Sequence, residues 1–440
     1  MNHLPEAFLQ RVEGQLGSEL PAFLHAMDDA PCRGIRFHPL RKLPADLLRE
    51  DRIAPIPWEK NGWLLRRESN AGRVIFHEAG AYYLQEPGAM IPARVMNAQP
   101  GEILLDLCAA PGGKSTQMGI DMAGEGILVC NEPVPKRAQV LSRNLERMGI
   151  PNAVVTCAYP DQLARKWPEG FDGVMVDAPC SGEGMFRRQP ETRQEWSAER
   201  ARGCAQRQVD ILDAAAGMVR PGGRLVYATC TWNPEENEEQ VNAFVRRHPE
   251  FALAAFDLPG VHAPEGMFTC WPQRMAGEGQ FAALLRKSGN GAAHLPAGKL
   301  LRMSREEQAA FSGFGDGLPM PTGRLGTTLI HLPLLPDLQG IRTLRVGLHL
   351  GEIRGKTFIP DHAAALHFTP PAASCMDLGP EEAGLYLAGE SLPGEAAGWV
   401  LMRYEGLVLG WGKGSEGRIR NHYPKGLRNA RLRAEEEDAP

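Results

Sequence analysis

The sequence contains no hydrophobic run long enough to cross a membrane, which takes about 20 consecutive apolar residues. Its first residues read MNHLPEAFLQRVEGQL, with the apolar spacing of an amphipathic helix, and acids together with Arg11 interrupt any signal-peptide core. Both absences argue against a membrane-spanning or exported protein. We therefore expect a cytoplasmic protein with no membrane partner.

Paired cysteines and metal-ligand spacings are missing as well. The nine cysteines are odd in number and scattered, so in a reducing compartment they are expected to be free thiols. No pair has zinc-ligand spacing with histidines nearby. We therefore expect neither a disulfide framework nor a bound metal.

Excess positive charge is also absent, because the net charge is −5. The distribution is uneven, however: the segment from Lys413 to Arg433 holds seven Lys or Arg residues and one acid, Glu416, and the acidic tail Glu435–Asp438 follows it. Local charge rather than total charge sets the affinity for a nucleic acid. The basic segment is thus a candidate RNA contact, and a solvated basic helix end explains it equally well.

The 440 residues are enough for two or three domains. In the middle of the chain, short apolar runs alternate with amphipathic stretches, which predicts a mostly parallel sheet with helices on both faces. The expected strands are 103–106, 127–131, 154–156, 173–177, 224–229 and 281–285, and the expected helices are 114–123, 135–148, 205–219 and 235–248.

This alternation separates three regions. Residues 1–90 mix helical and strand-like pieces and predict a small α+β domain. Residues 91–288 form the doubly wound α/β domain, and the small polar segment Ser288–Lys299 is typical of a linker. Residues 300–440, rich in Gly, Leu and Pro, predict a compact α+β or β-rich module.

A loop rich in small residues follows the first of the central strands. Leu104–Lys114 reads LLDLCAAPGGK: the strand ends at Asp106, and Gly112 and Gly113 allow a ligand to approach the backbone at the start of a helix. Glu132 ends the next strand, where a carboxylate can accept both ribose hydroxyls. Together the loop and Glu132 favour a nucleoside-bearing cofactor. Taken singly, the loop could be an ordinary tight turn, and Glu132 could be an exposed carboxylate. A nucleotide triphosphate is disfavoured because G-x-x-x-x-G-K-[ST] is missing.

Two cysteines are expected at the same edge of the sheet. Asp177 and Cys180 follow one strand, and Cys230 follows another. Single cysteines are usually small buried residues, and we interpret the remaining six outside the cofactor loop that way. A redox motif of the C-x-x-C type is excluded by the separation of about fifty residues between the two.

The two thiols suit one reaction in particular. Carbon 5 of a pyrimidine is a poor nucleophile, but a thiolate that adds to carbon 6 turns the ring into an enolate-like species able to attack a methyl sulfonium. A base must then remove the carbon 5 proton, and the thiolate must leave. Thiolate fits this role because it is populated near neutral pH and intrinsically reactive.

The sequence resembles a known family, the RNA cytosine-C5 methyltransferases of the NOL1/NOP2/Sun type. Its three signature segments are matched by DLCAAPGGKSTQ (106–117), VDAPCSGEGMFR (176–187) and YATCTWNPEENEEQV (227–241). YYLQEPGAM (82–90) and WPQRMAGEGQFAALLRK (271–287) agree as well. The C-terminal runs 347–366 and 398–428 resemble the PUA-like tail of the RsmF/YebU-type enzymes that act on 16S ribosomal RNA. The resemblance covers most of the chain and implies a Rossmann-like class I methyltransferase core.

The resemblance also implies roles for matching residues. Cys230 would attack carbon 6, Cys180 would assist release of the methylated base, and Asp177 would lie near both the cofactor and the flipped cytosine. S-adenosyl-L-methionine would be held by Cys108, Ala109, Ala110, Pro111, Gly112, Gly113, Lys114, Glu132, Arg137 and Asp177.

One position departs from the family pattern. Many relatives carry an acid after the third strand that contacts the adenine amino group, whereas here Tyr159 stands there, with Asp161 two residues on. Stacking by Tyr159, Asp161 or a backbone group could each recognise adenine.

The N-terminal segment 32–44 resembles the small substrate-facing domain of the family, which is related to RNA-recognition folds. Arg36, Arg41 and Lys42 would supply charge and Phe37 a stacking face. An ordinary strand with exposed basic residues explains the same pattern.

We therefore expect a monomeric enzyme that methylates carbon 5 of a cytosine, most simply in 16S ribosomal RNA or the small ribosomal subunit. The same reaction on transfer RNA is an alternative. DNA cytosine methylation is disfavoured, because those enzymes take the nucleophile from the P-C segment and lack this T-C run. A non-catalytic RNA-binding assembly factor is a third alternative, although it would need neither thiol.

Overall fold

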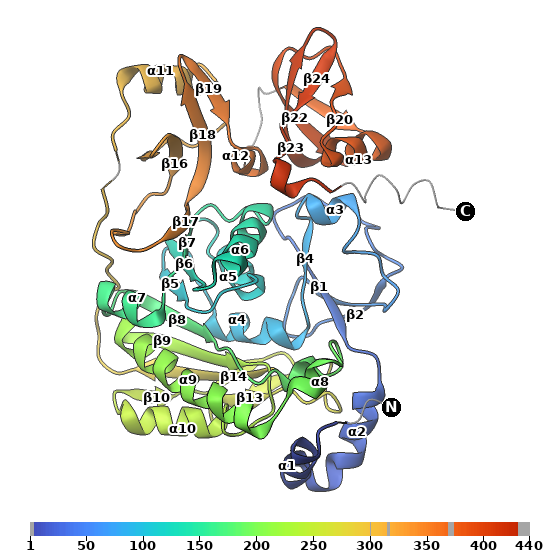
Figure 1. Ribbon diagram of the computed structural model, residues 1–440, viewed down its shortest axis with the longest axis vertical. Coiled ribbons are helices and arrows are strands. Elements are labelled where there is room, and N and C mark those ends of the chain that lie inside the picture. Colours follow the sequence, from blue (N-terminus) through green and yellow to red (C-terminus); the bar gives the residue numbers. More distant parts are fainter. Residues whose placement is uncertain (1–3, 300, 315–316, 368–373, 430–440) are drawn as a thin grey trace.

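The computed structural model describes residues 4–299, 301–314, 317–367 and 374–429. A mixed sheet with helices on both faces forms the centre of the molecule, and smaller N-terminal and C-terminal units lie beside and above it (Figure 1). The α/β expectation is confirmed.

The central sheet has the strand order β10-β14-β9-β8-β5-β6-β7-β17. Its parallel part consists of β5 (Ile103–Asp106), β6 (Ile127–Asn131), β7 (Ala153–Thr156), β8 (Phe171–Asp177) and β9 (Val219–Thr229). Antiparallel strands follow at one edge: β14 (Phe281–Lys287), β10 (Phe251–Leu253) and β13 (Met267–Thr269).

Successive residues of a strand point to opposite sides of the sheet. Because the side chains on both sides are apolar here, helices cover both faces of the sheet. Leu105 packs into the core on one face and Leu104 into the core on the other. The first face is covered by α7 (Pro160–Lys166), α9 (Ala198–Met218) and α10 (Glu238–Arg247), and the second by α4 (Ile91–Met96), α5 (Gly113–Asp121) and α6 (Pro135–Arg147).

Helix bounds follow from local sequence. In α6 the buried residues Ala138, Leu141 and Leu145 recur at helical spacing, and Pro135 occupies the start, where its missing N–H costs nothing. Helix α9 begins at Ala198, earlier than the expected 205, because the Ser197 hydroxyl caps it by accepting a 3.1 Å bond from the Arg200 N–H.

One strand from beyond the polar linker joins the central sheet. Strand β17 (Thr343–Val346) pairs antiparallel with β7 at the edge, through partners such as Val346 and Val154. An unpaired strand edge exposes backbone donors and acceptors, and β17 satisfies them. The sequence offered no signal for this pairing.

The N-terminal unit has two parts. Helices α1 (Glu6–Leu16) and α2 (Leu20–Asp28) pack their apolar sides against an aromatic cluster that includes Phe186, Trp232 and Trp271. A four-stranded sheet follows, in the order β2-β3-β1-β4, with β1 (Arg33–Phe37), β2 (Arg52–Pro55), β3 (Gly62–Leu65) and β4 (Tyr82–Leu84).

Two of the basic residues expected to face RNA are used inside the protein instead. The buried Arg36 guanidinium donates to the Gly113 carbonyl at 3.2 Å and to the Thr116 hydroxyl at 2.9 Å. Arg41 donates to the Arg147 carbonyl at 2.9 Å and to the Ala79 carbonyl. They join the N-terminal sheet to α5 and α6, so of the three only Lys42 remains exposed.

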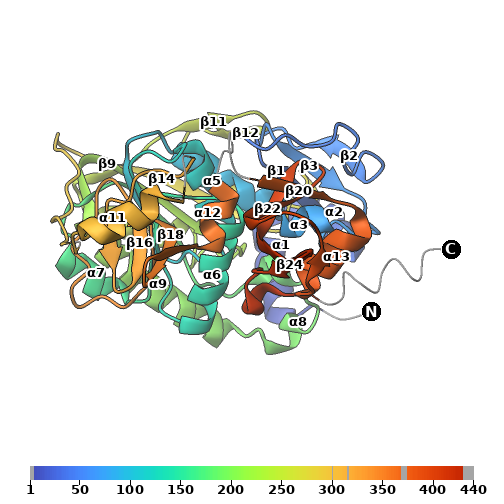
Figure 2. The same cartoon turned by 90° about the horizontal axis from the view of Figure 1, so that it is seen from above.

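The C-terminal region forms two sheets. The first has the order β15-β16-β18-β19, and the second β20-β22-β23-β24-β21. Helix α12 (His362–His367) lies between them, against β18 (Leu348–Arg354) and β23 (Leu407–Ser415), as Figure 2 shows from above. The other strands are β15 (Gly323–Leu325), β16 (Thr328–His331), β19 (Thr357–Pro360), β20 (Ser374–Leu378), β21 (Leu392–Pro393), β22 (Gly398–Tyr404) and β24 (Arg418–Asn421).

A buried charge cluster joins these C-terminal sheets to α6. Glu146 pairs with Arg345 at 2.7 Å and with His362 Nδ1 at 2.7 Å, and His362 Nε2 bonds the Leu409 carbonyl at 3.1 Å. Burial acts to raise the pKa of Glu146, but the Arg345 charge and the bond from His362 outweigh it and hold the pKa well below its usual range.

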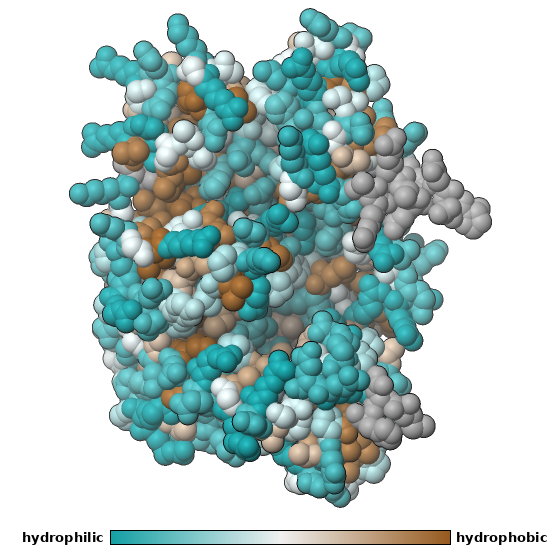
Figure 3. Space-filling model, viewed as in Figure 1, coloured by the Kyte–Doolittle hydropathy of each residue, from teal (hydrophilic) through white to brown (hydrophobic). Residues whose placement is uncertain are grey.

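The visible face of the molecule is mostly hydrophilic, with apolar side chains gathered in separate patches (Figure 3). The basic candidate segment lies partly on the second C-terminal sheet, where Lys413, Arg418 and Arg420 belong to β23 and β24. Arg431, Arg433 and the acidic tail Glu435–Asp438 lie outside the described residues.

We expect the junction between the N-terminal sheet and α6 to weaken as pH falls. His38 is buried there, with Nε2 3.1 Å from the Met148 carbonyl, and burial with the Arg41 charge lowers its pKa to about 3. Between pH 6.5 and 3, His38 binds a proton in the unfolded chain but not in the folded chain. As the pH falls through this range, the free energy of unfolding therefore decreases by about 1.4 kcal/mol per pH unit from its value above pH 6.5. Denaturant unfolding at pH 7 and pH 5 measures this slope.

His38→Gln is the matched control, because its amide can still donate to Met148 without titrating. The wild type should lose more stability than this variant between pH 7 and pH 5. Equal losses would contradict the assignment of a neutral, buried His38.

Candidate active site

The small-residue loop lies at the carboxyl end of β5, as the sequence predicted. The Ser115 hydroxyl, from the first turn of α5, donates to Asp106 Oδ2 at 2.6 Å. This bond joins the two ends of the loop, the start of α5 and the last residue of β5. Gly112 has φ 111°, a conformation that side chains rarely adopt, and a Cβ there would meet Leu141 at 3.1 Å. Burial raises the pKa of Asp106 to about 7 despite the Ser115 bond.

Lys114 and Asp177 meet across the carboxyl ends of neighbouring strands. Lys114 Nζ lies 2.8 Å from Asp177 Oδ2. Burial acts to lower the pKa of Lys114, but the charge of Asp177 and its hydrogen bond outweigh burial and raise the pKa above its usual value. Lys114 is therefore a fixed cation beside a carboxylate that remains 30% exposed to the cavity.

Glu132 also lies where the sequence placed it, at the end of β6. Its carboxylate is 3% exposed, accepts a 2.9 Å bond from the Val134 N–H and pairs with Arg137 at 3.0 Å. Arg137 donates in turn to the Ala110 carbonyl at 3.0 Å. Arg137 thus holds Glu132 and the small-residue loop together.

The two thiols are brought into direct contact. Cys180 Sγ lies 3.2 Å from Cys230 Sγ, and the Cys230 N–H donates to Cys180 Sγ at 3.4 Å. The hydrogen bond to Cys230, together with burial, raises the pKa of Cys180 well above its usual value. One of the two thiols donates to the other across this contact, and the raised pKa favours the protonated form of Cys180.

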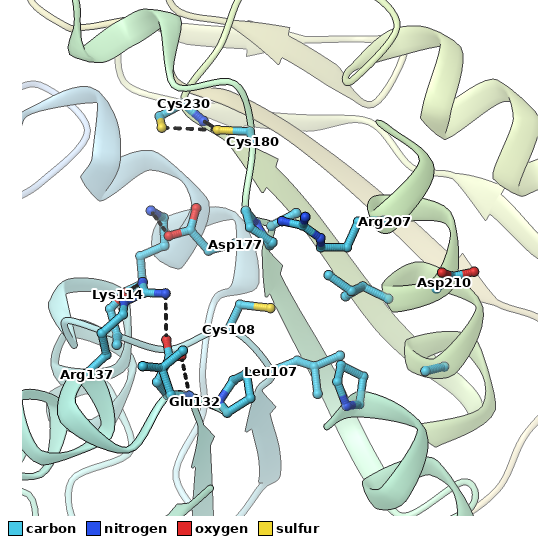
Figure 4. A pocket seen from close by; sticks show the side chains of 18 of the residues that line it. Leu107, Cys108, Lys114, Glu132, Arg137, Asp177, Cys180, Arg207, Asp210 and Cys230 are labelled. Carbon is cyan, nitrogen blue, oxygen red and sulfur yellow. Dashed lines mark hydrogen bonds and ion pairs between the residues drawn. The ribbon is translucent and has the colours of Figure 1, made fainter. Parts of the chain in front are cut away.

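One cavity of about 1230 Å³ connects most of the predicted site residues: it is lined by Cys108, Ala110, Lys114, Glu132, Arg137, Asp177, Cys180 and Cys230. Ala109, Pro111, Gly112 and Gly113 belong to the same loop and are not part of the lining. Figure 4 shows the thiols at one end, Lys114 with Asp177 next to them, and Glu132 with Arg137 farther along. Cys108 lies on the cavity wall, and burial with the nearby carboxylates raises the pKa of its thiol. The cavity has room for a nucleoside-sized group at one end and a base at the other.

Tyr159 and Asp161 both line the cavity beyond Glu132. Tyr159 is 68% exposed, and Asp161 pairs with Arg165 at 2.8 Å. Each remains a candidate for contact with an adenine ring. Arg207 and Asp210 of α9 line the opposite wall, and sequence reasoning did not identify them (Figure 4).

Sequence reasoning also missed the buried polar residues behind the thiols. Glu236 is fully buried, and its carboxylate accepts bonds from the Ser181 N–H at 2.8 Å and from Gln208 Nε2 at 2.9 Å. Asn237 is buried too and bonds to both neighbours of Cys230. The available signal was the acid-rich run NPEEN (233–237), which lies within the signature segment 227–241.

Within the described ranges, no helix combines the length and apolar character needed to span a membrane. In that same part of the chain, no group of three or more His, Cys, Asp or Glu side chains is arranged to hold a metal ion.

Comparison with known proteins gives the site its context. Residues 93–286 match the family model of 16S rRNA methyltransferase RsmB/F, and residues 4–87 match that of the N-terminal domain of 16S rRNA methyltransferase RsmF. Residues 322–368 match the first C-terminal domain of the RsmF rRNA methyltransferase, and residues 373–429 match the methyltransferase RsmF PUA domain.

Curated relatives match along nearly the whole chain. Ribosomal RNA small subunit methyltransferase F of Klebsiella pneumoniae (strain 342) is 32% identical over 472 residues, covering 97% of this chain and 96% of that protein. The protein of the same name from Aeromonas hydrophila is 33% identical over 476 residues and 97% of each chain. This chain belongs to the RsmB/F family of 16S ribosomal RNA methyltransferases.

Solved structures share the fold. A methyltransferase homologue from Pyrococcus horikoshii is 25% identical with a TM-score of 0.53, covering 62% of this chain and 91% of that one. NSun6 from Pyrococcus horikoshii, solved with SFG, is 18% identical with a TM-score of 0.58, covering 65% of this chain and 99% of that one. The chain is thus an S-adenosylmethionine-dependent RNA methyltransferase with a Rossmann-like core and a PUA domain, as the sequence predicted.

Proposed function

We propose that this chain methylates carbon 5 of a cytosine in 16S ribosomal RNA, with Cys230 as the nucleophile. The observation that carries the proposal is the contact of the Cys180 and Cys230 thiols, 3.2 Å apart, at one end of the cavity. RNA methylation in general needs no thiol, whereas methylation of carbon 5 needs one to activate the ring.

The residues around the cavity fit S-adenosylmethionine. Glu132 is a nearly buried carboxylate that lines the cavity and suits ribose hydroxyls, and Arg137 balances its charge. Residues 108–113 carry only small side chains and one proline, and Gly112 is left-handed, so the loop backbone is open to a methionine group. When bound, this cofactor supplies a methyl group on a positively charged sulfur, which the activated carbon 5 accepts.

Cys230 begins the reaction. After its thiol proton passes to solvent, its sulfur adds to carbon 6 of the cytosine as the thiolate, and the electron pair of the 5,6 double bond moves toward carbon 5 and the ring nitrogen. Asp177 lies beside the thiols and can accept a hydrogen bond from the exocyclic amine, while the Lys114 ammonium fixes the carboxylate that does so. Asp177 would thus orient the base, and the positive charge of Lys114 would stabilise the negative charge that develops on the ring.

Cys180 ends the reaction. After methylation a base, supplied by solvent water in the open cavity, takes the carbon 5 proton. The electron pair of that carbon–hydrogen bond re-forms the 5,6 double bond, and the electron pair of the carbon–sulfur bond returns to Cys230. The protonated Cys180 thiol lies within hydrogen-bond distance of the departing sulfur and can stabilise it as it leaves.

The substrate must reach a recessed cavity. A cytosine within a helix hides carbons 5 and 6, so the base must be flipped or lie in an unpaired segment. We propose that the N-terminal domain (1–90) and the C-terminal PUA-containing region (300–440) position 16S ribosomal RNA or the small ribosomal subunit around the catalytic domain (91–288). We propose further that the chain acts as a monomer, in the cytoplasm.

Bisulfite sequencing of total RNA, with and without the gene, tests the reaction and the substrate together. We expect one or a few protected cytosines in 16S ribosomal RNA to disappear without the gene and to return with wild-type protein but not with Cys230→Ala. Loss confined to transfer RNA would keep the chemistry and change the substrate. No change at any cytosine would favour a non-catalytic RNA-binding factor.

Cys180→Ala should trap the reaction after its first half. Without the Cys180 thiol the Cys230 sulfur leaves slowly, so a covalent protein–RNA complex should accumulate in the presence of the cofactor and survive on a denaturing gel. The double variant Cys180→Ala/Cys230→Ala is the control and should form no such complex. Full turnover by Cys180→Ala without a complex would contradict the role in release.

Glu132→Gln should weaken binding of the cofactor without touching the thiols. A neutral amide loses two charge-assisted bonds to ribose hydroxyls, and affinity should fall by about 10- to 100-fold, or 1.4–2.8 kcal/mol. Isothermal titration with S-adenosylhomocysteine measures it. Asp161→Asn, at the exposed end of the cavity, tests the adenine contact in parallel. Unchanged affinity in Glu132→Gln would place the ribose elsewhere.

A further inference from the structure

The two cysteine-bearing loops are joined by a buried carboxylate that does not line the cavity. Glu236 Oε2 accepts from the Ser181 N–H, one residue after Cys180, at 2.8 Å. The same oxygen accepts from Gln208 Nε2 at 2.9 Å, and Oε1 accepts from Asn233 Nδ2 at 3.3 Å. One side chain thus connects the Cys180 loop, the Cys230 loop and α9.

Further hydrogen bonds hold this junction together. Gln208 Nε2 also donates to the Pro179 carbonyl at 3.1 Å, so the Cys180 loop is held from both sides. The Ser181 and Thr231 hydroxyls, each one residue after a thiol, lie 2.9 Å apart. A buried carboxylate with its donors in place is a rigid connection, because losing it leaves several buried donors unpaired.

Cys230 has a separate support. Asn237 accepts a 2.6 Å bond from the Thr229 hydroxyl and donates a 2.8 Å bond to the Thr231 carbonyl, and so holds both neighbours of Cys230. Cys230 also directly follows β9, whose last residue pairs with Phe281 of β14. The position of Cys230 therefore does not depend on the Glu236 side chain, whereas the position of Cys180 relative to it does.

We infer that Glu236 is a positioning residue that holds the Cys180 thiol against Cys230 for release of the methylated base. This inference rests on the proposed function. Glu236 touches neither substrate nor cofactor and acts through Ser181 and Gln208. Its loss should slow release of the product more than formation of the covalent complex.

The first test uses the purified full chain with 16S ribosomal RNA and S-adenosylmethionine. Glu236→Ala should accumulate the covalent protein–RNA complex and lower product release by about 10- to 100-fold, the usual effect of an ångström-scale displacement. KM for the cofactor should not change. Glu236→Gln, whose amide oxygen can still accept from Ser181 and Gln208, should restore most of the release. The double variant Glu236→Ala/Cys180→Ala should accumulate no more complex than Cys180→Ala.

The control is Asp172→Asn. Asp172 is a carboxylate at the other end of β8, bonded to Arg220 and to the Ile103 N–H, so its loss also costs stability but lies far from the thiols along the strand. It should show no excess of the covalent complex. Equal loss of formation and release in Glu236→Ala, or accumulation of the complex in Asp172→Asn as well, would overturn the inference in favour of a general structural role.

A second readout needs no RNA and separates this inference from the proposed function. A diazenedicarboxamide oxidant joins two adjacent thiols as a disulfide while its N=N bond takes up the two hydrogens. In the wild type the Cys180–Cys230 disulfide should form readily, because the sulfurs are 3.2 Å apart. Peptide mapping should show it forming at least about 10-fold more slowly in Glu236→Ala and at the wild-type rate in Asp172→Asn.

The outcomes are distinguishable. If the disulfide forms more slowly in Glu236→Ala and the wild type methylates no RNA, Glu236 positions the Cys180 thiol but the proposed function is wrong. An unchanged rate of disulfide formation would overturn the positioning role, whatever the enzyme methylates.

Discussion

The parallel pairing of β5, β8 and β9 is the constraint on which the rest of the site depends. Asp106 lies beside Met175, and Asp177 lies beside Ala228, so these strands end at nearly the same level. Parallel strands have their carboxyl ends at one edge, and the loops that follow carry the small-residue segment 108–114 and both thiols. Three segments, of which the first and last lie more than a hundred residues apart, thereby share one cavity.

Charge at this edge is balanced by few groups. Asp106, Glu132 and Asp177 would repel one another at a recessed edge, and Lys114 and Arg137 are the cations paired with two of them. Asp106 has the Ser115 hydroxyl instead of a cation, and burial raises its pKa to about 7. A bound sulfonium would add positive charge to a site with an excess of carboxylates, which is favourable in a medium of low polarity.

Much of this could be read from the sequence because the signals are local. Strand β6 and the start of α6 fall where apolar runs and Pro135 predicted them, and Cys108–Lys114, Glu132, Cys180 and Cys230 lie at the expected edge. Two features could not be read. Strand β17 depends on an open edge far away in sequence, and Arg36 looked like an exposed RNA contact but is buried against Gly113 and Thr116.

The sequence by itself determined the family, and it predicts the reaction and the residues that carry it, because motifs such as APGGK and T-C are short runs of adjacent positions. Only the tertiary structure decided how those residues meet. Strand pairing and helix packing brought Cys180 within 3.2 Å of Cys230, and folding placed Glu236 and Gln208 behind them. Such contacts join positions up to about fifty residues apart in the sequence, so a local motif does not reveal them. A buried carboxylate such as Glu236 needs hydrogen-bond partners, and the tertiary structure decides which residues supply them.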